Sequence, residues 1–282
     1  MNNPIYLIYS ILLSGLILHG CSGSVPKKPA TPTQPNNKVV WADDGSEVAV
    51  VVHRFEEKRG SLPSGTTDKR HFKHRILVQN LGEDKRRTIT EWRDYQNGQI
   101  FYMKQAGYFV VESLLGNGAR RFDKIALNGN EILIIETPDT EHQGCRDKEP
   151  TSPKMPKPAR VQHTVIPSPD GQQLAYIYSP ACGKVTVEFL HANNLSLFDS
   201  QTMDVDEPMN ATWHIDGYVI LATNSNAWKV TALAPPEPIT SPKCLSPVTT
   251  SSDVSLEGKR VSFEGDKLVT KDVGSQKAFG CH

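Results

Sequence analysis

The stretch Pro167-Ser168-Pro169-Asp170-Gly171-Gln172-Gln173-Leu174-Ala175 indicates how this chain is built. An Asp-Gly pair favours a tight turn, because the Asp side chain bonds the local backbone and glycine adopts conformations that other residues avoid. After the turn the sequence becomes apolar, as in a strand that enters a core. The stretch therefore predicts a turn between two neighbouring antiparallel strands.

Two other segments have the same order of residues. They are Trp41-Ala42-Asp43-Asp44-Gly45-Ser46-Glu47-Val48-Ala49 and Trp213-His214-Ile215-Asp216-Gly217-Tyr218-Val219-Ile220-Leu221. Weaker copies occur at Asn97-Gly98, Asn128-Gly129 and Glu257-Gly258. In a β-propeller, a sheet of four short strands, called a blade, recurs about every 40–45 residues. The later glycine spacings match this period. We predict five blades if Gly98 and Gly129 share one, and six if each glycine marks its own.

The rest of the chain also indicates an all-β fold. It contains no amphipathic helical stretch of ten or more residues, and short β-rich runs are separated by turn-forming pairs. Several runs are apolar at consecutive positions, which predicts strands that are covered on both faces. The expected strands are Val48–Val52, Arg75–Gln79, Gln99–Met103, Tyr108–Val111, Ile132–Ile135, Leu174–Tyr178, Val185–Leu190 and Tyr218–Ala222.

The three repeated segments resemble the Ser-Pro-Asp-Gly repeat of TolB-like β-propellers, where the turn joins the first two strands of a blade. This resemblance covers most of residues 38–282 and implies one β-propeller domain. Tandem β-sandwiches are the alternative, since they also have short strands and regular turns. The residues after Gly258 are too few for a full blade, so we expect the segment near Val39–Trp41 to complete the last one and to remove its unpaired edges.

The acidic and aromatic residues of the repeat have structural explanations. Aspartates of such turns usually bond the local backbone, and we expect this rather than acid catalysis of Asp43, Asp44, Asp170 and Asp216. Trp41 and Trp213 occupy equivalent positions. We therefore expect both tryptophans to pack between blades rather than to stack on a ligand.

The amino terminus predicts an exported, lipid-anchored protein. The apolar run from Ile5 to Leu18 is shorter than the roughly 20 residues of a transmembrane helix but fits a signal peptide. It ends in Leu18-His19-Gly20-Cys21, which resembles the lipobox of bacterial lipoproteins, cut before a cysteine that becomes lipidated. The leader has no Lys or Arg before this run, and His19 is unusual for the family. An ordinary secretory leader is the alternative.

The lipoprotein resemblance implies domain boundaries and a location. Residues 1–20 would be the signal peptide, and acyl chains on Cys21 would anchor the protein to the membrane. Ser22 stands where the inner-membrane retention signal of enterobacterial lipoproteins has Asp, which implies the outer membrane, on its periplasmic or surface face. Residues 21–37 hold four prolines and no aromatic residue, so we expect a tether before the propeller domain at 38–282.

Four further cysteines predict disulfide bonds in an exported domain. They are Cys145, Cys182, Cys244 and Cys281. Three pairings are possible, and sequence order favours Cys145–Cys182 with Cys244–Cys281. A metal site is the competing interpretation, but the sequence offers no Cys-x-x-Cys or Cys-x-x-His spacing to support it.

The sequence contains no pattern that indicates catalysis. It has no nucleophile elbow, phosphate loop or zincin helix, and nothing points to a cofactor or a metal. A net charge of zero gives no global electrostatic support for nucleic-acid binding. Propellers bind through their loops, so the long insertions Phe55–Arg70 and Pro138–Pro158 are the candidates for specificity.

A basic cluster borders the first insertion and is the candidate partner-binding surface. Its residues are Lys69, Arg70, His71, Lys73, His74 and Arg75. Because residues three apart on a strand point to opposite faces, His71 and His74 do not form a chelating pair, and we expect both at the surface.

These features favour a non-enzymatic envelope propeller that binds another envelope protein. The alternative is an envelope glycan-binding or glycan-cleaving protein. In that case carboxylates would converge on the propeller channel, about 5–10 Å apart.

Overall fold

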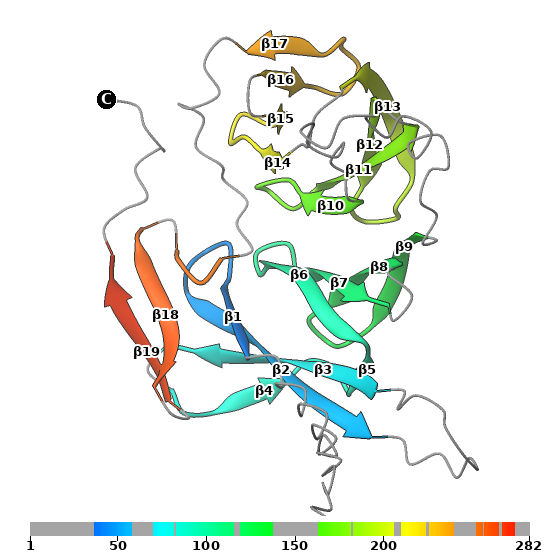
Figure 1. The fold of residues 1–282 in the computed structure, drawn as a ribbon. Helices are drawn as coiled ribbons and strands as arrows, with labels where there is room; N and C mark the ends of the chain where they lie inside the picture. The colour runs from blue at the N-terminus through cyan, green and yellow to red at the C-terminus, as the bar shows by residue number, and fades with distance from the viewer. Residues whose placement is uncertain are drawn as a thin grey trace, which may run out of the picture. The chain divides into compact units, whose positions relative to one another are not determined.

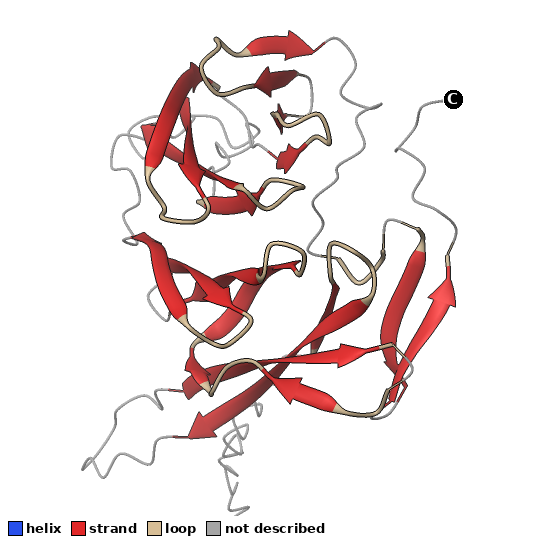
Figure 2. Ribbon diagram, turned by 180° about the vertical axis from the view of Figure 1, so that it is seen from behind, coloured by secondary structure: helices blue, strands red, loops and turns tan. Residues whose placement is uncertain are grey.

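The structure is a computed structural model. It describes residues 37–57, 70–81, 83–115, 119–137, 163–181, 183–205, 210–223, 226–239, 252–255, 257–264 and 267–273. Figure 2 shows that the regular structure of these residues consists of strands. None of them forms a helix that is long and apolar enough to cross a membrane.

The described strands form five antiparallel sheets, which we call blades 1 to 5 in chain order (Figure 1). Blade 1 contains β1 (Lys38–Trp41), β2 (Glu47–Glu57), β3 (Arg70–Asn80), β4 (Arg86–Thr88) and β5 (Arg93–Asp94). Blade 2 contains β6 (Gln96–Met103), β7 (Tyr108–Leu114), β8 (Arg120–Ala126) and β9 (Glu131–Thr137).

The remaining strands follow the same plan. Blade 3 contains β10 (Thr164–Pro167), β11 (Gln173–Ala181), β12 (Lys184–His191) and β13 (Leu197–Asp204). Blade 4 contains β14 (Asn210–Trp213), β15 (Val219–Ala222), β16 (Ala227–Val230) and β17 (Glu237–Ile239). Blade 5 contains β18 (Lys259–Glu264) and β19 (Lys267–Asp272), with an isolated bridge from Val254 to Arg260.

Each blade is a meander in which consecutive strands pair with one another. In blade 1, both β4 and β5 pair with β3, so they share the outer position. This strand order confirms the all-β propeller and does not fit the Greek-key connections of tandem β-sandwiches. Gly98 and Gly129 both belong to blade 2, one in β6 and one in the turn before β9, which leaves five blades rather than six.

A turn of the same geometry joins the first and second strands of blades 1 to 4, and in blade 5 it joins the isolated bridge at Val254 to β18. Its glycine has a left-handed φ and donates its N–H to the carbonyl three residues earlier. These glycines are Gly45 (67°), Gly107 (80°), Gly171 (68°), Gly217 (83°) and Gly258 (82°). Glycine adopts this φ without a steric penalty, which explains its recurrence. The repeat in the sequence predicts four of the five glycines, but it places the blade 2 turn at Gly98 instead of Gly107.

The predicted strands are confirmed, with Tyr218 lying just before β15. The consecutive apolar residues of β2 are covered on both faces, as expected. Val48 and Val50 pack in a cluster with Val261 of blade 5, whereas Ala49 and Val51 pack in another with residues of blade 2. Complete burial of such a side chain contributes about 1.5–3 kcal/mol, so this alternation holds blade 1 to both neighbours.

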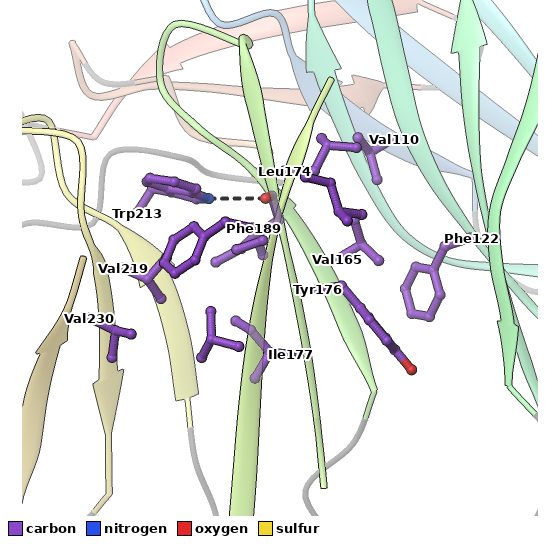
Figure 3. Packing of buried hydrophobic residues seen from close by; sticks show 14 of the residues in the cluster. Val110, Phe122, Val165, Leu174, Tyr176, Ile177, Phe189, Trp213, Val219 and Val230 are labelled. Atoms are coloured by element: carbon purple, nitrogen blue, oxygen red, sulfur yellow. Dashed lines mark hydrogen bonds between the residues drawn. The ribbon is translucent and has the colours of Figure 1, made fainter. Parts of the chain in front are cut away.

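The largest apolar cluster joins blades 2, 3 and 4 (Figure 3). Val110 and Phe122 of blade 2 lie on one side of β10 and β11, and Trp213 lies on the other. The indole Nε1 of Trp213 donates to the Ile166 carbonyl oxygen at 3.0 Å, the dashed line in Figure 3. Both repeat tryptophans therefore pack between blades, since Trp41 bonds blade 5 in the same way.

The expectation that Val39–Trp41 would complete the last blade is wrong. β1 pairs with β2 along its whole length, from Lys38 opposite Val51 to Trp41 opposite Val48, and β18–β19 form a separate sheet. Blade 1 thus uses its own first strand. It contacts blade 5 instead through the Trp41 amide, which donates to the Ser252 carbonyl at 3.1 Å, and through packing of Trp41 in the cluster that contains Val261.

Two turn aspartates bond locally, as expected. The Asp44 carboxylate accepts from the Ser46 amide at 2.9 Å, and the Asp170 carboxylate accepts from the Gln172 amide at 3.0 Å. Asp43 differs, because its carboxylate accepts from the Lys104 amide of blade 2 at 2.9 Å. Burial is the main reason that its pKa is raised. Asp43 therefore links two blades rather than shaping its own turn.

Candidate binding surface

The predicted cluster lies on β3, whose pairing with β2 divides it between two faces. Arg54 is opposite Lys73 and Val52 is opposite Arg75, so Lys73 and Arg75 share a face with Arg54. His74 is opposite His53 and lies on the other face. Of the remaining cluster, Lys69 lies outside the described residues, and Arg70 and His71 are placed only as backbone partners of Glu57 and Glu56.

Several other predicted sites also lie outside the described residues. These are the anchor Cys21, the cysteines Cys145, Cys182, Cys244 and Cys281, and the insertion Pro138–Pro158. The signal peptide, the tether and both disulfide pairings therefore remain predictions from sequence.

Trp92 organises the first face. Two guanidinium carbons lie over its ring, that of Arg54 at 4.1 Å and that of Arg75 at 4.9 Å from the centroid. Each such contact contributes about 0.5–1 kcal/mol at an exposed site and up to roughly 2 kcal/mol when desolvated. Lys73 lies on the same face, with its Nζ 3.7 Å from the Asp94 carboxylate. We call Arg54, Lys73, Arg75 and Trp92 the basic–aromatic surface.

All four side chains of the basic–aromatic surface are half-buried, so neighbouring atoms restrict the conformations of the three cationic side chains. Arg75 Nε is buried and bonds no acceptor among the described residues. A guanidinium that is stacked on an aromatic ring keeps a fixed orientation and presents its remaining donors to an anion. Arg54 and Trp92 were not predicted from the sequence, because neither belongs to the run of basic residues at 69–75.

On the second face, His74 is completely buried, which contradicts its expected place at the surface. Its Nδ1 lies 2.9 Å from the Tyr95 carbonyl oxygen and its Nε2 lies 3.1 Å from Arg93 Nη1. The carbonyl accepts the Nδ1 proton, so Nε2 accepts from Arg93. Burial, together with the nearby charges of Arg93 and His53, lowers the pKa of His74 to about 4.

Arg93 connects this face to blade 2. Its guanidinium pairs with the fully buried Asp123 and bonds Glu131 Oε1 at 2.9 Å and Ser113 Oγ at 3.2 Å. Ser, His and Asp thus meet in one buried site, but Arg93 bonds all three. Since the lone pair of His74 Nε2 is used by Arg93, the imidazole is not placed to take a proton from Ser113, which a catalytic triad requires. The cluster joins two blades.

A second polar cluster joins the first strands of blades 1, 2 and 3. Lys38 Nζ donates to the Gly98 carbonyl at 2.9 Å, and Thr164 Oγ1 donates to Gln99 Oε1 at 3.2 Å. The Gln99 amide donates to Glu112 Oε2 at 2.7 Å, and the other oxygen of Glu112 pairs with Arg120. Burial lowers the pKa of Lys38, and the charge of Glu112 opposes this effect.

The second polar cluster contains a carboxylate, Glu112, that could be considered for the glycan-cleaving alternative. A glycosidase needs one carboxylate that is free to give up or accept a proton. Both oxygens of Glu112 are engaged by donors, which suits a structural role. Among the described residues, no group of three or more His, Cys, Asp or Glu side chains is arranged to hold a metal ion.

Comparison with known proteins finds no matching family model and no matching curated protein. Solved structures with similar folds include TolB from Acinetobacter baumannii, at 13% identity over 87% of this chain and 53% of that chain, with a TM-score of 0.42. The β-propeller domain of the Trilobed protease from Pyrococcus furiosus matches at 10% identity over 88% of this chain and 72% of that chain, with a TM-score of 0.47. An uncharacterized protein from Listeria monocytogenes matches at 14% identity over 66% of this chain and 53% of that chain, with a TM-score of 0.37. This chain thus resembles propeller structures at low identity, and it spans about half the length of TolB and of the Listeria protein.

Proposed function

We propose that this chain is a lipid-anchored protein of the bacterial envelope whose propeller binds another envelope protein and catalyses no reaction. The observation that carries the proposal is the basic–aromatic surface, where Arg54 and Arg75 stack on Trp92 beside Lys73. Interfaces between proteins are enriched in Trp and Arg, which are also the residues that most often dominate binding energy.

The chemistry of this surface favours an acidic partner. Three cations lie on one face, where Asp94 contacts Lys73. A carboxylate on the partner would form charge-assisted hydrogen bonds with the guanidinium groups, which are stronger than bonds between neutral groups. The partner is therefore expected to present Asp or Glu side chains next to an apolar contact for Trp92.

The proposed lipid anchor would determine where in the cell this binding occurs. Acyl chains on Cys21 would hold the propeller near the outer membrane by a tether of residues 21–37, so the partner would also be an envelope protein. An anionic envelope glycan would offer similar charges. The test must therefore tell a protein from a glycan.

In-cell photocrosslinking tests the proposal. A benzophenone amino acid replaces the exposed Glu91, which precedes Trp92, and in a second strain it replaces Leu233 of blade 4, which is 81% exposed. We expect a protease-sensitive adduct from position 91 and none of the same mass from position 233. The adduct should disappear in Arg54→Ala/Arg75→Ala.

The charge control is Lys184→Ala/Arg260→Ala, which also removes two surface cations, with side chains 51% and 54% exposed. It should keep the adduct. If the position 91 adduct survives loss of Arg54 and Arg75, or if it resists protease but is removed by glycan hydrolases, protein binding at this surface is refuted.

A further inference from the structure

Trp92, the ring of the basic–aromatic surface, lies between β4 and β5 in a segment without regular secondary structure. Before the ring, the Thr90 side chain accepts a hydrogen bond from the Ile76 amide at 3.1 Å. After it, β5 is two residues long and pairs with β3, where Arg93 is opposite His74. The position of the ring therefore depends on how β5 is held against β3.

The imidazole of His74 holds β5 through two hydrogen bonds. Its Nδ1 donates to the Tyr95 carbonyl at 2.9 Å, and its Nε2 accepts from Arg93 Nη1 at 3.1 Å. Tyr95 has a left-handed φ of 75°, which costs a non-glycine residue free energy and persists where surrounding contacts enforce it. The bond from His74 is one such contact, so the backbone after Trp92 is under strain that the imidazole helps to maintain.

A proton from solvent on His74 Nε2 would remove the second of these bonds. The nitrogen would then carry a hydrogen and could not accept from Arg93, and two cations would face each other across 3.1 Å. Arg93 is also bonded by Asp123, Glu131 and Ser113 of blade 2. The guanidinium therefore stays with blade 2 while His74 stays in the blade 1 sheet, and the repulsion acts between β3 and β5.

The charges that face His74 oppose its protonation in the closed arrangement. Arg93 and His53, whose ring centroid is 6.4 Å away, disfavour a second positive charge, whereas Asp123 favours it. Asp123 is already paired with Arg93 and with Arg121 Nε, the latter at 3.0 Å. Burial, followed by the charges of Arg93 and His53, lowers the pKa of His74 to about 4.

We propose that His74 and Arg93 position Trp92, and that protonation of His74 opens the basic–aromatic surface and releases an anionic partner. Trp92 precedes Arg93 in the chain and moves with β5. Arg75 follows His74 on β3, so separation of the two strands also separates the ring from this guanidinium. A guanidinium without its ring loses its fixed orientation toward an anion. The inference rests on the proposed binding role and adds its regulation by pH.

Linkage gives the direction and the size of the effect. A neutral His74 favours the closed arrangement, and the proton favours the open one, in which the imidazole has an ordinary pKa near 6.5. With a pKa of about 4 when closed, the ratio of closed to open chains falls about 30-fold between pH 7.5 and pH 5, and about 70-fold by pH 4.5. Binding is therefore lost as the pH falls and restored as it rises.

Fluorine NMR of the full chain labelled with fluorotryptophan follows the ring in the absence of a partner. Trp92→Phe and Trp213→Phe identify the two signals, and Trp213, which packs between blades 3 and 4, reports on the rest of the fold. We expect the Trp92 signal to move with a midpoint between pH 4 and 6.5. The Trp213 signal should stay in place down to pH 4.5.

Calorimetry with a naphthalene trisulfonate measures anion binding, because the charge of this probe is constant over the range whereas a carboxylate would take up protons. We expect the affinity at pH 4.5 to be at least threefold and at most about 70-fold lower than at pH 7.5. His74→Asn retains a donor for the Tyr95 carbonyl but has no titrating nitrogen, so it should lose both pH effects. His191→Gln, at an exposed histidine, should keep both.

Several results would overturn the inference. An unmoved Trp92 signal in the wild-type chain does so by itself, and the wild-type titration remains decisive if His74→Asn does not fold. The same holds if the Trp213 signal moves together with that of Trp92, because the chain would then be unfolding as a whole. A pH effect that persists in folded His74→Asn, or a probe that fails to bind at pH 7.5 or binds equally at both pH values, also refutes it.

The proposed protein partner is tested separately by the crosslinked adduct from position 91 in cells. Loss of that adduct would refute the partner, whereas the Trp92 titration would still establish whether acid opens the surface. The two proposals can therefore fail independently.

Discussion

Trp41 and Trp213 each end the first strand of a blade, and each donates its indole N–H to a backbone carbonyl of the neighbouring blade. The acceptor is Asp253 of blade 5 for Trp41, at 2.9 Å, and Ile166 of blade 3 for Trp213, at 3.0 Å. The same tryptophan hydrogen bond therefore joins blade 1 to blade 5 and blade 4 to blade 3. The end of the described chain is fastened to its beginning by side-chain packing and hydrogen bonds, without exchange of a strand.

The shared role of the two tryptophans predicts similar costs for their replacement. Trp41→Phe and Trp213→Phe each remove one hydrogen bond between blades, which costs about 1 kcal/mol of the free energy of unfolding. Urea denaturation measures this loss. Trp228→Phe, at a half-buried position of β16, is the control and should cost less. Equal effects at all three positions would show that the hydrogen bonds between blades do not matter.

Gly107 is predicted to be required by backbone conformation and not by space. Nothing lies within 4 Å of the position that a Cβ would occupy, but φ is +80°. Gly107→Ala should therefore lower the free energy of unfolding by about 1 kcal/mol, and Gly107→Asn by less, because Asn tolerates the left-handed region. Thermal melts of the two variants test the order. A neutral Ala variant would argue against the fifth copy of the repeat turn.

The buried His74 predicts that the protein loses stability in mild acid. Its pKa is about 4 in the folded chain and 6.5 in a model peptide, so folding favours the neutral imidazole. Stability from this group is complete above pH 6.5, falls as the pH drops from 6.5 to 4, and reaches a loss of about 3 kcal/mol. Unfolding free energies measured across this range should show the slope.

The matching variants separate His74 from the other histidines. His74→Asn should flatten the pH dependence of stability between pH 4 and 6.5, whereas replacement of the exposed His191 by Gln should leave it unchanged. An unaltered slope in His74→Asn would assign the acid sensitivity to another group.

The anchor prediction concerns Cys21. Cys21→Ser should abolish incorporation of a labelled fatty acid and release the protein from membranes, because the acyl chains are the proposed apolar anchor. Fractionation and metabolic labelling of both forms provide the readout. Equal labelling, or equal membrane retention, would refute lipidation at this residue.

The disulfide prediction concerns Cys145–Cys182 and Cys244–Cys281. Peptide mapping of the exported protein without reductant should recover both linked pairs. The chain-entropy model assigns about 4 kcal/mol to each closed loop, so reduction should lower the melting temperature. Four free thiols, or a Cys182–Cys244 link, would show that sequence order is a poor guide here.

The candidate surface was only partly predictable from sequence. The basic run at 69–75 identified Lys73 and Arg75, but it could not show that His74 is buried. That depends on Arg93 and Asp123, which come from β5 and β8. The basic run also could not identify Trp92 as the ring on which Arg54 and Arg75 stack, since these three residues come from separate segments of the chain.

The sequence by itself determined the local features of this protein: strands with consecutive apolar residues, most of the glycine turns, and the tryptophans between blades. These depend on the preferences of a few adjacent residues, which are written in order along the chain. Only the tertiary structure decided that Gly107 and not Gly98 makes the turn of blade 2, that β1 stays in blade 1, and that His74 faces inward. Those outcomes depend on register and on contacts between blades, where residues far apart in sequence compete for the same partners.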